Sequence, residues 1–127
     1  KSDGVSTCTH SSGWFVITNK LGQMDVYRDD CTHHTRLQLG FKPDLYYGVC
    51  MLGSIVAVVE WKGGIILFNL SGAEVGRLSK QQLGVRDIIL GVGVTDRGLL
   101  QLAEGVVKKY DGTEYSLIQK IHLYKFE

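Results

Sequence analysis

The amino-acid sequence predicts an all-β protein, specifically a segment of a β-propeller. Sixteen glycines and one proline punctuate the chain. Short apolar runs are broken about every 8–12 residues, as in antiparallel strands joined by tight turns. The chain also repeats itself with a period of about 40–45 residues, the length of one four-stranded propeller blade. Apolar residues at helical spacing occur only between Val75 and Val85, where Gly76 and Gly84 weaken a helix.

Three repeats account for almost the whole chain. In each repeat the second strand follows a glycine and the third strand ends in an aromatic residue. The glycines are 40 and 45 residues apart, and they are Gly13, Gly53 and Gly98. The aromatic residues are 41 and 42 residues apart, and they are Tyr27, Phe68 and Tyr110. We therefore expect one propeller segment over residues 1–127, with four-stranded antiparallel blades at about 1–44, 45–90 and 91–127.

The strands and turns inside each repeat follow the same logic. The second strands read WFVIT, IVAVV and LLQLA. Such nearly continuous apolar runs predict strands covered on both faces, here by neighbouring blades. The aromatic residue that ends each third strand is expected to pack between blades. Residues that tolerate positive φ predict hairpin turns at Ser71-Gly72, Asp96–Gly98 and Asp111–Thr113.

Composition limits the classes of function. The 127 residues carry 14 Lys and Arg against 13 Asp and Glu. The sequence lacks the basic cluster that binds nucleic acid or an anionic membrane. No apolar run approaches the about 20 residues of a membrane-spanning helix. We expect a soluble protein, either cytoplasmic or secreted.

The repeats resemble those of NHL-type six-bladed propellers, such as the ones that end the tripartite-motif ubiquitin ligases. Each blade of that family carries a run of the form GV.V...G.l.v.D...vqvfd..G, which Gly91–Asp111 and Gly48–Gly72 match best. The Asp, Asn and Arg that follow the second strand in the family are replaced by Asn19, Glu60 and Glu104, with no matching Arg. The resemblance implies a six-bladed ring with a face that binds protein or single-stranded RNA.

Three blades are fewer than the four to eight of a closed propeller. An open arc exposes two apolar blade faces, which natural proteins avoid. We therefore expect a six-bladed ring, completed either by a second copy of the chain or by further chain of a longer protein.

One face of the disc holds the candidate binding residues, on loops between the second and third strands and between blades. Trp61 stands in a Glu-Trp-Lys-Gly-Gly turn. It can stack on a partner, or it can cover the end of the neighbouring blade. The connections between blades contribute Asp44, Tyr46, Tyr47, Arg86 and Asp87. These residues suit a peptide or another polar ligand, or they are ordinary solvated loop residues.

A polar residue recurs at one position of all three repeats, as Asn19, Glu60 and Glu104. These residues are expected to form a ring near the mouth of the channel. Such a ring can bind a cation or a ligand, or it can accept hydrogen bonds from backbone amides.

The opposite face carries Cys8-Thr9-His10 and Cys31-Thr32-His33-His34 in turns of one blade. Structural zinc sites use C-x₂₋₄-C or H-x₃₋₅-H spacing, which neither run matches. We therefore expect no metal site, although Cys8, His10, Cys31 and His33 are the residues that could contribute to one. In an extracellular protein Cys8 and Cys31 could instead form a disulfide, and otherwise they are unrelated turn residues.

The sequence contains no nucleophile elbow, P-loop or dinucleotide-binding glycine motif. We expect a non-enzymatic binding module without a cofactor, which recognises a protein or peptide through Trp61 and Tyr46-Tyr47 and associates with itself. The alternatives are a carbohydrate-binding propeller, in which aromatic residues stack on sugars, and the RNA-binding propeller that the family resemblance implies.

Overall fold

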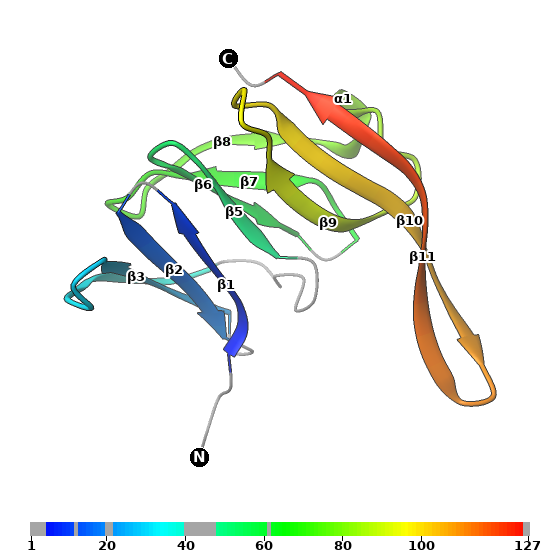
Figure 1. Cartoon of the computed structure of the whole chain (residues 1–127), viewed down its shortest axis with the longest axis horizontal. Helices are drawn as coiled ribbons and strands as arrows, with labels where there is room; N and C mark the ends of the chain where they lie inside the picture. Colours follow the sequence, from blue (N-terminus) through cyan, green and yellow to red (C-terminus); the bar gives the residue numbers. More distant parts are fainter. Residues whose placement is uncertain (1–4, 12, 20–21, 40–47, 61, 126–127) are drawn as a thin grey trace.

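The computed structural model describes residues 5–11, 13–19, 22–39, 48–60 and 62–125. These residues form three antiparallel sheets and one helical turn (Figure 1). The all-β class predicted from the sequence is therefore confirmed. No helix in these ranges is long and apolar enough to cross a membrane.

The first two sheets have four strands each, and their strands are paired in chain order. The first sheet contains β1 (Val5–Ser11), β2 (Trp14–Asn19), β3 (Gln23–Arg28) and β4 (His33–Gln38). The second contains β5 (Val49–Leu52), β6 (Ile55–Val59), β7 (Ile65–Phe68) and β8 (Glu74–Leu78). Both match the predicted blades. A single helical turn, α1 (Lys80–Leu83), leads from the second sheet to the third.

The third sheet corrects the prediction of four strands. It has three, in the order β11-β10-β9, and these are β9 (Ile88–Val94), β10 (Leu100–Tyr110) and β11 (Thr113–Tyr124). The two segments expected as separate strands on either side of Glu104-Gly105 form the continuous strand β10. The chain passes a β-bulge there instead of turning. Gly105 permits it, because a Cβ at this position would lie 2.0 Å from the Leu117 carbonyl oxygen.

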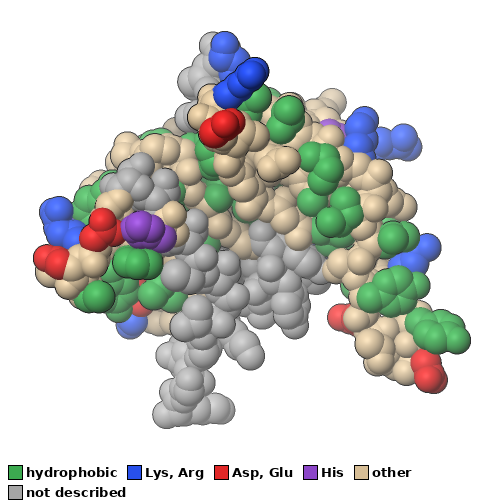
Figure 2. Space-filling model, viewed as in Figure 1, with side chains coloured by type: hydrophobic (Ala, Val, Ile, Leu, Met, Phe, Trp, Pro, Cys, Tyr) green, Lys and Arg blue, Asp and Glu red, His purple; other side chains and the backbone are tan. Residues whose placement is uncertain are grey.

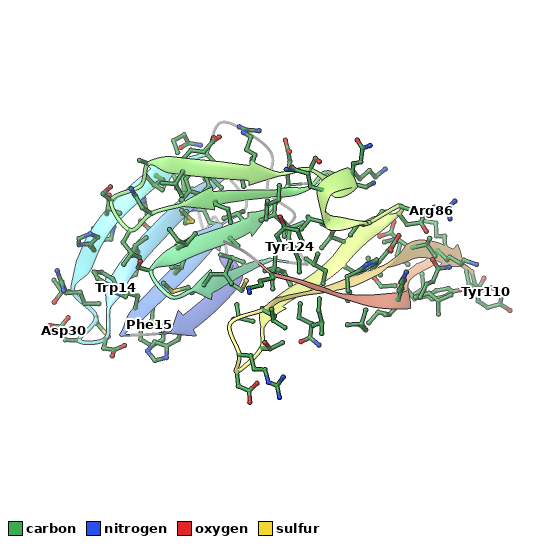
Figure 3. All side chains as sticks on the ribbon, turned by 90° about the horizontal axis from the view of Figure 1, so that it is seen from above. Trp14, Phe15, Asp30, Arg86, Tyr110 and Tyr124 are labelled. Carbon is green, nitrogen blue, oxygen red and sulfur yellow. The ribbon has the colours of Figure 1, made fainter. Side chains whose placement is uncertain are left out.

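The three sheets pack face to face around their inner strands. The innermost strands β1, β5 and β9 are neighbours, and the sheets fan outward from them (Figures 1 and 3). One buried cluster joins the first sheet to the second, and another joins the second sheet to the third. β6, the apolar second strand of the middle sheet, is thus buried between sheets on both faces, as predicted, whereas β2 and β10 are covered by a described sheet on one face only.

The aromatic residues that end the third strands of the repeats are buried to different degrees. Phe68 is buried between the first and second sheets, as predicted. Tyr110 is 75% exposed, so its predicted packing between blades is wrong. The reason is that β10 and β11 run beyond the rest of the sheet as a projecting hairpin, and Tyr110 lies at its tip (Figures 1 and 3).

The predicted turns are confirmed. Asp111 and Gly112, with φ of 52° and 80°, form the two-residue connection of the β10–β11 hairpin. Two successive positive φ angles match the right-handed twist of the flanking strands. Gly72 and Gly98 also have positive φ, at 98° and 78°, in the turns that follow β7 and β9.

Candidate functional site

Three of the residues predicted to bind a partner, Glu60, Arg86 and Asp87, lie where β6 turns into β7 or where β8 connects to β9 through α1. We call this surface the loop face. Its described part consists of residues 60, 63–64 and 77–87, together with Glu104, Gln119 and Lys120 of the third sheet. Two hollows open on it, one on either side of α1.

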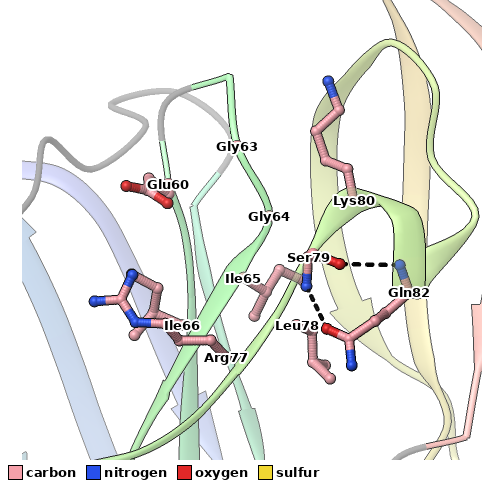
Figure 4. A pocket seen from close by; sticks show the side chains of 10 residues that line it. All are labelled: Glu60, Gly63, Gly64, Ile65, Ile66, Arg77, Leu78, Ser79, Lys80 and Gln82. Carbon is pink, nitrogen blue, oxygen red and sulfur yellow. Dashed lines mark hydrogen bonds between the residues drawn. The ribbon is translucent and has the colours of Figure 1, made fainter.

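The first hollow has a volume of about 330 Å³ and lies between the β6–β7 turn and the start of α1 (Figure 4). Its charged side chains are Glu60, Arg77 and Lys80. Arg77 is also bound to Glu74, with Nε 2.7 Å from Oε2. The hollow therefore presents a carboxylate and two cations around a small apolar floor of Ile65, Ile66 and Leu78.

The walls of this hollow are fixed by local backbone chemistry. Ser79 Oγ accepts a hydrogen bond from the Gln82 amide, and the Ser79 amide donates to Gln82 Oε1 (Figure 4). This reciprocal capping box starts α1. Gly64 packs directly against the strand opposite, since a Cβ there would lie 2.1 Å from the Leu78 carbonyl oxygen. The short distance between the two walls depends on that glycine.

The second hollow has a volume of about 320 Å³ and lies between α1 and the third sheet. Two exposed charges of the α1–β9 connection, Arg86 and Asp87, line it together with Lys120 of β11. Arg86 lies at the end of the molecule that carries the third sheet (Figure 3). Both hollows therefore offer charges of either sign within a shallow depression.

Glu104 connects the two walls of the second hollow through hydrogen bonds. It is 5% exposed, and its Oε2 accepts hydrogen bonds from the amides of Arg86 and Asp87, each 2.7 Å long. Its Oε1 lies 2.5 Å from Nε2 of His122 on β11. One carboxylate thus binds the α1–β9 connection to the outermost strand of the third sheet.

The hydrogen bonds to Glu104 keep it ionised. Burial raises the pKa of this carboxyl, but hydrogen bonds from the Asp87 amide, His122 and the Arg86 amide outweigh burial and lower the pKa to about 2. A side chain already engaged by three donors is a structural anchor. Of the two roles considered for this position, Glu104 performs the second, satisfying backbone amides.

The polar ring of Asn19, Glu60 and Glu104 stays a prediction, and its three residues contact different neighbours. Glu60 lines the first hollow and Glu104 underlies the second. The Asn19 side chain is engaged with Gln23 across the β2–β3 turn, where its Oδ1 accepts from the Gln23 amide at 3.1 Å. Four other predicted binding residues lie outside the described ranges, namely Asp44, Tyr46, Tyr47 and Trp61.

Two histidines of the opposite face, His10 and His33, are bound to carboxylates. His10 Nε2 lies 2.6 Å from Asp29 Oδ1, and His33 Nε2 lies 3.0 Å from Asp25 Oδ1. Cys31 is an exposed free thiol, whereas the Cys8 side chain is outside the described part of the structure. Among the residues whose side chains are described, no group of three or more potential ligands surrounds a metal-sized space.

Sequence reasoning missed an ion cluster on the first sheet. Asp25 is 8% exposed, and Arg36 binds it through two hydrogen bonds, Nε to Oδ1 at 2.8 Å and Nη2 to Oδ2 at 2.9 Å. The bonds from Arg36 lower the pKa of Asp25 against the opposing effect of burial. Asp25 and Arg36 are directly opposite each other on β3 and β4. Their opposite charges at facing positions are the signal that could have revealed the pair.

Comparison with known proteins identifies the architecture. No family model matches the sequence, and no curated protein matches it either. Among solved structures, the fold is similar to that of BBS1N in complex with ARL6DN, with a TM-score of 0.54 at 20% sequence identity. The match covers 87% of this chain and 36% of that one.

The chain folds as part of a β-propeller. It spans about a third of the length of the structure that it matches, since the covered share of that chain is 36%. At 20% identity the similarity concerns the fold alone. The narrower resemblance to NHL-type propellers stays a prediction.

Proposed function

We propose that this propeller segment is a non-catalytic recognition module whose loop face binds a protein or peptide partner. The observation that carries the proposal is the pair of shallow hollows on either side of α1. Both are open and both contain charges of either sign. Such a surface suits an extended or protruding segment that carries charges of its own.

The rigidity of the surface supports the proposal. The capping box at Ser79 and the three hydrogen bonds to Glu104 fix both ends of the connection that separates the hollows. A preformed site loses little conformational entropy on binding. The solved structure with a similar fold is a complex with a second protein, ARL6DN, which is consistent with a propeller that binds proteins.

Trp61 directly follows Glu60, which lines the first hollow. We propose that Trp61 contributes a stacking contact and that Asp44, Tyr46 and Tyr47 extend the same surface. Trp61→Ala is then expected to weaken partner binding without unfolding the protein. Unchanged affinity of that variant would remove Trp61 from the site.

The experiment is selection of binding peptides from a displayed random library with the chain as bait. A double variant, Lys80→Glu with Arg86→Glu, reverses one charge in each hollow and is expected to weaken the selected peptides at least about tenfold. The matched control is Lys108→Glu with Lys109→Glu, two exposed cations on the β10–β11 hairpin. Peptides that bind both double variants equally, or that lose binding to the control variant instead, would contradict the assignment.

A further inference from the structure

The two interfaces between sheets use the same strand positions each time. At the first interface, Val16, Met24 and Val26 of the first sheet share a buried cluster with Val56, Val58 and Phe68 of the second. At the second interface, Ala57, Ile65 and Leu67 of the second sheet share a cluster with Leu100 and Leu102 of the third. Alternate residues of each second strand therefore face the preceding and the following sheet.

The outer face of the first sheet has the residues for another such interface. We call Phe15, Ile17 and Tyr27 the first-sheet outer face. Phe15 is paired with Tyr27 across β2 and β3, as Val56 is paired with Phe68 across β6 and β7. Val56 is fully buried against the preceding sheet and Phe68 is 7% exposed. Their counterparts Phe15 and Tyr27 are only partly buried, because none of the three described sheets lies against that side of the first sheet.

The outer face of the third sheet is equivalent at the other end of the arc. We call Ala103, Ile121 and Leu123 the third-sheet outer face. On the third sheet, Ile121 is paired with Ala103 and Leu123 with Gln101. The equivalent pairs on the first sheet are Met24 with Thr18 and Val26 with Val16. Met24 and Val26 are fully buried, whereas Ile121 is 51% and Leu123 is 60% exposed. Apolar side chains gather over this sheet on the right of Figure 2.

Each outer face also contains a hollow. Phe15, Ile17 and Tyr27 line an almost wholly apolar hollow of about 340 Å³ together with Cys31. The third-sheet outer face includes a hollow of about 290 Å³ in which Gly91 and Gly93 expose backbone beside Ile121. The aromatic side chains of the first-sheet outer face can therefore pack over the two glycines of the third-sheet outer face. The nearby Asp25 carboxylate is already paired with Arg36, so covering it leaves no unpaired charge.

We propose that the first-sheet outer face binds the third-sheet outer face of a second copy of this chain. The occupant is a second copy because each chain carries both halves of the interface. Each half lies at the strand positions that are buried at the two interfaces between sheets within the chain. Twofold pairing forms the contact twice and leaves neither face exposed. It gives six sheets, within the four to eight of closed propellers. The loop faces of the two copies then belong to one ring.

Light scattering on the purified chain across a range of concentrations tests the proposal. The expected mass is twice the 14.1 kDa of one chain. Ile17→Asp and Ile121→Lys each place an unpaired charge in the interface and are expected to weaken dimerisation at least about 100-fold. Val75→Lys is the matched control, because Val75 is 50% exposed on β8 and outside both faces. Its dimerisation should match that of the unmodified chain.

The decisive measurement is the combination of Ile17→Asp and Ile121→Lys in one chain. In the proposed ring each Asp faces the partner's Lys, so the double variant regains dimerisation that both single variants lack. If β11 strands paired edge to edge instead, Ile121→Lys alone would disrupt the dimer and Ile17→Asp would not restore it. That result, a monomer at every concentration, or an open polymer would overturn the proposal.

Circular dichroism and urea unfolding of each variant separate loss of assembly from loss of folding. Should a charged variant be unfolded, Tyr27→Ser and Leu123→Ser replace it, since both side chains are partly or largely exposed in the single chain. A folded serine variant that still dimerises like the unmodified chain contradicts the proposal. The outcome is independent of the peptide-binding experiment, because neither outer face contains a residue of the loop face.

Discussion

Replacing Glu104 by alanine removes the carboxylate that joins the α1–β9 connection to β11. The change leaves two backbone amides and His122 without their acceptor in a site where Glu104 itself is 5% exposed. Hydrogen bonds to a charged group contribute about 1.5–3 kcal/mol each. The three bonds share one acceptor and are not additive. We expect a loss of about 3–5 kcal/mol in the free energy of unfolding, as when a buried pair loses one partner.

Urea unfolding at neutral pH measures this loss, and Glu114→Ala is the matched control. Glu114 is an exposed carboxylate on the same hairpin, so its removal should change stability by less than about 0.5 kcal/mol. A domain of this size is stable by about 5–15 kcal/mol, so the predicted loss is a large fraction of the whole. Equal stabilities of the two variants would refute the role assigned to Glu104.

The pH dependence provides a second test with a defined sign. The pKa of Glu104 is about 2 in the folded chain, below the ordinary value of 4.5 that the unfolded chain has. The unfolded chain therefore binds the proton first, and the contribution of Glu104 is complete above about pH 4.5. It is lost as the pH falls from 4.5 toward 2. The stabilities of Glu104→Ala and the unmodified chain should converge over this interval, and a constant difference would contradict the reasoning.

Three further substitutions test other parts of the fold by urea unfolding. Gly64→Ala should cost about 3 kcal/mol because its Cβ meets a carbonyl oxygen, whereas Gly76→Ala, whose Cβ would lie at an ordinary 3.6 Å from Leu67 Cδ1, should be nearly neutral. Asp25→Asn removes the charge that binds Arg36 and should cost about 1–2 kcal/mol at neutral pH. The difference should shrink as the pH falls below 3.8, the ordinary pKa of Asp, because the unfolded chain binds the proton before the folded chain does. Gly112→Ala should cost about 1 kcal/mol, since φ is 80° at an otherwise open hairpin tip. Equal stabilities of the two glycine variants would contradict the first argument. The second would be contradicted if the acid profile of Asp25→Asn ran parallel to that of the unmodified chain, and the third if Gly112→Ala were as stable as the unmodified chain.

The repeat and its turns could be predicted because they depend on local chemistry. Apolar second strands and glycines at positive φ are visible in the sequence, and the first two sheets match their predicted strands. The path of the third sheet could not be predicted in this way. Glu104-Gly105 looks like the turn of the earlier repeats, but the Glu104 carboxylate is bound by the amides of Arg86 and Asp87 and by His122, 17 or 18 residues away.

Only those residues of the candidate site that lie in local sequence patterns could be predicted. Glu60, Arg86 and Asp87 do line hollows on the predicted face. The contributions of Arg77, Lys80 and Lys120 depend on how β8, α1 and β11 pack together, which no local pattern records. Asp25 was missed because its pairing with Arg36 depends on the register between β3 and β4, which neither strand records by itself.

The hydrogen bonds that Glu104 accepts connect segments that are distant in the sequence. The amides of Arg86 and Asp87 belong to an exposed connection, yet their acceptor lies on β10 and is held by a histidine on β11. We therefore expect these two amides to exchange their hydrogens with solvent at rates similar to those of the β10 and β11 amides. The connection that separates the two hollows would then open and close in one cooperative unit with the third sheet.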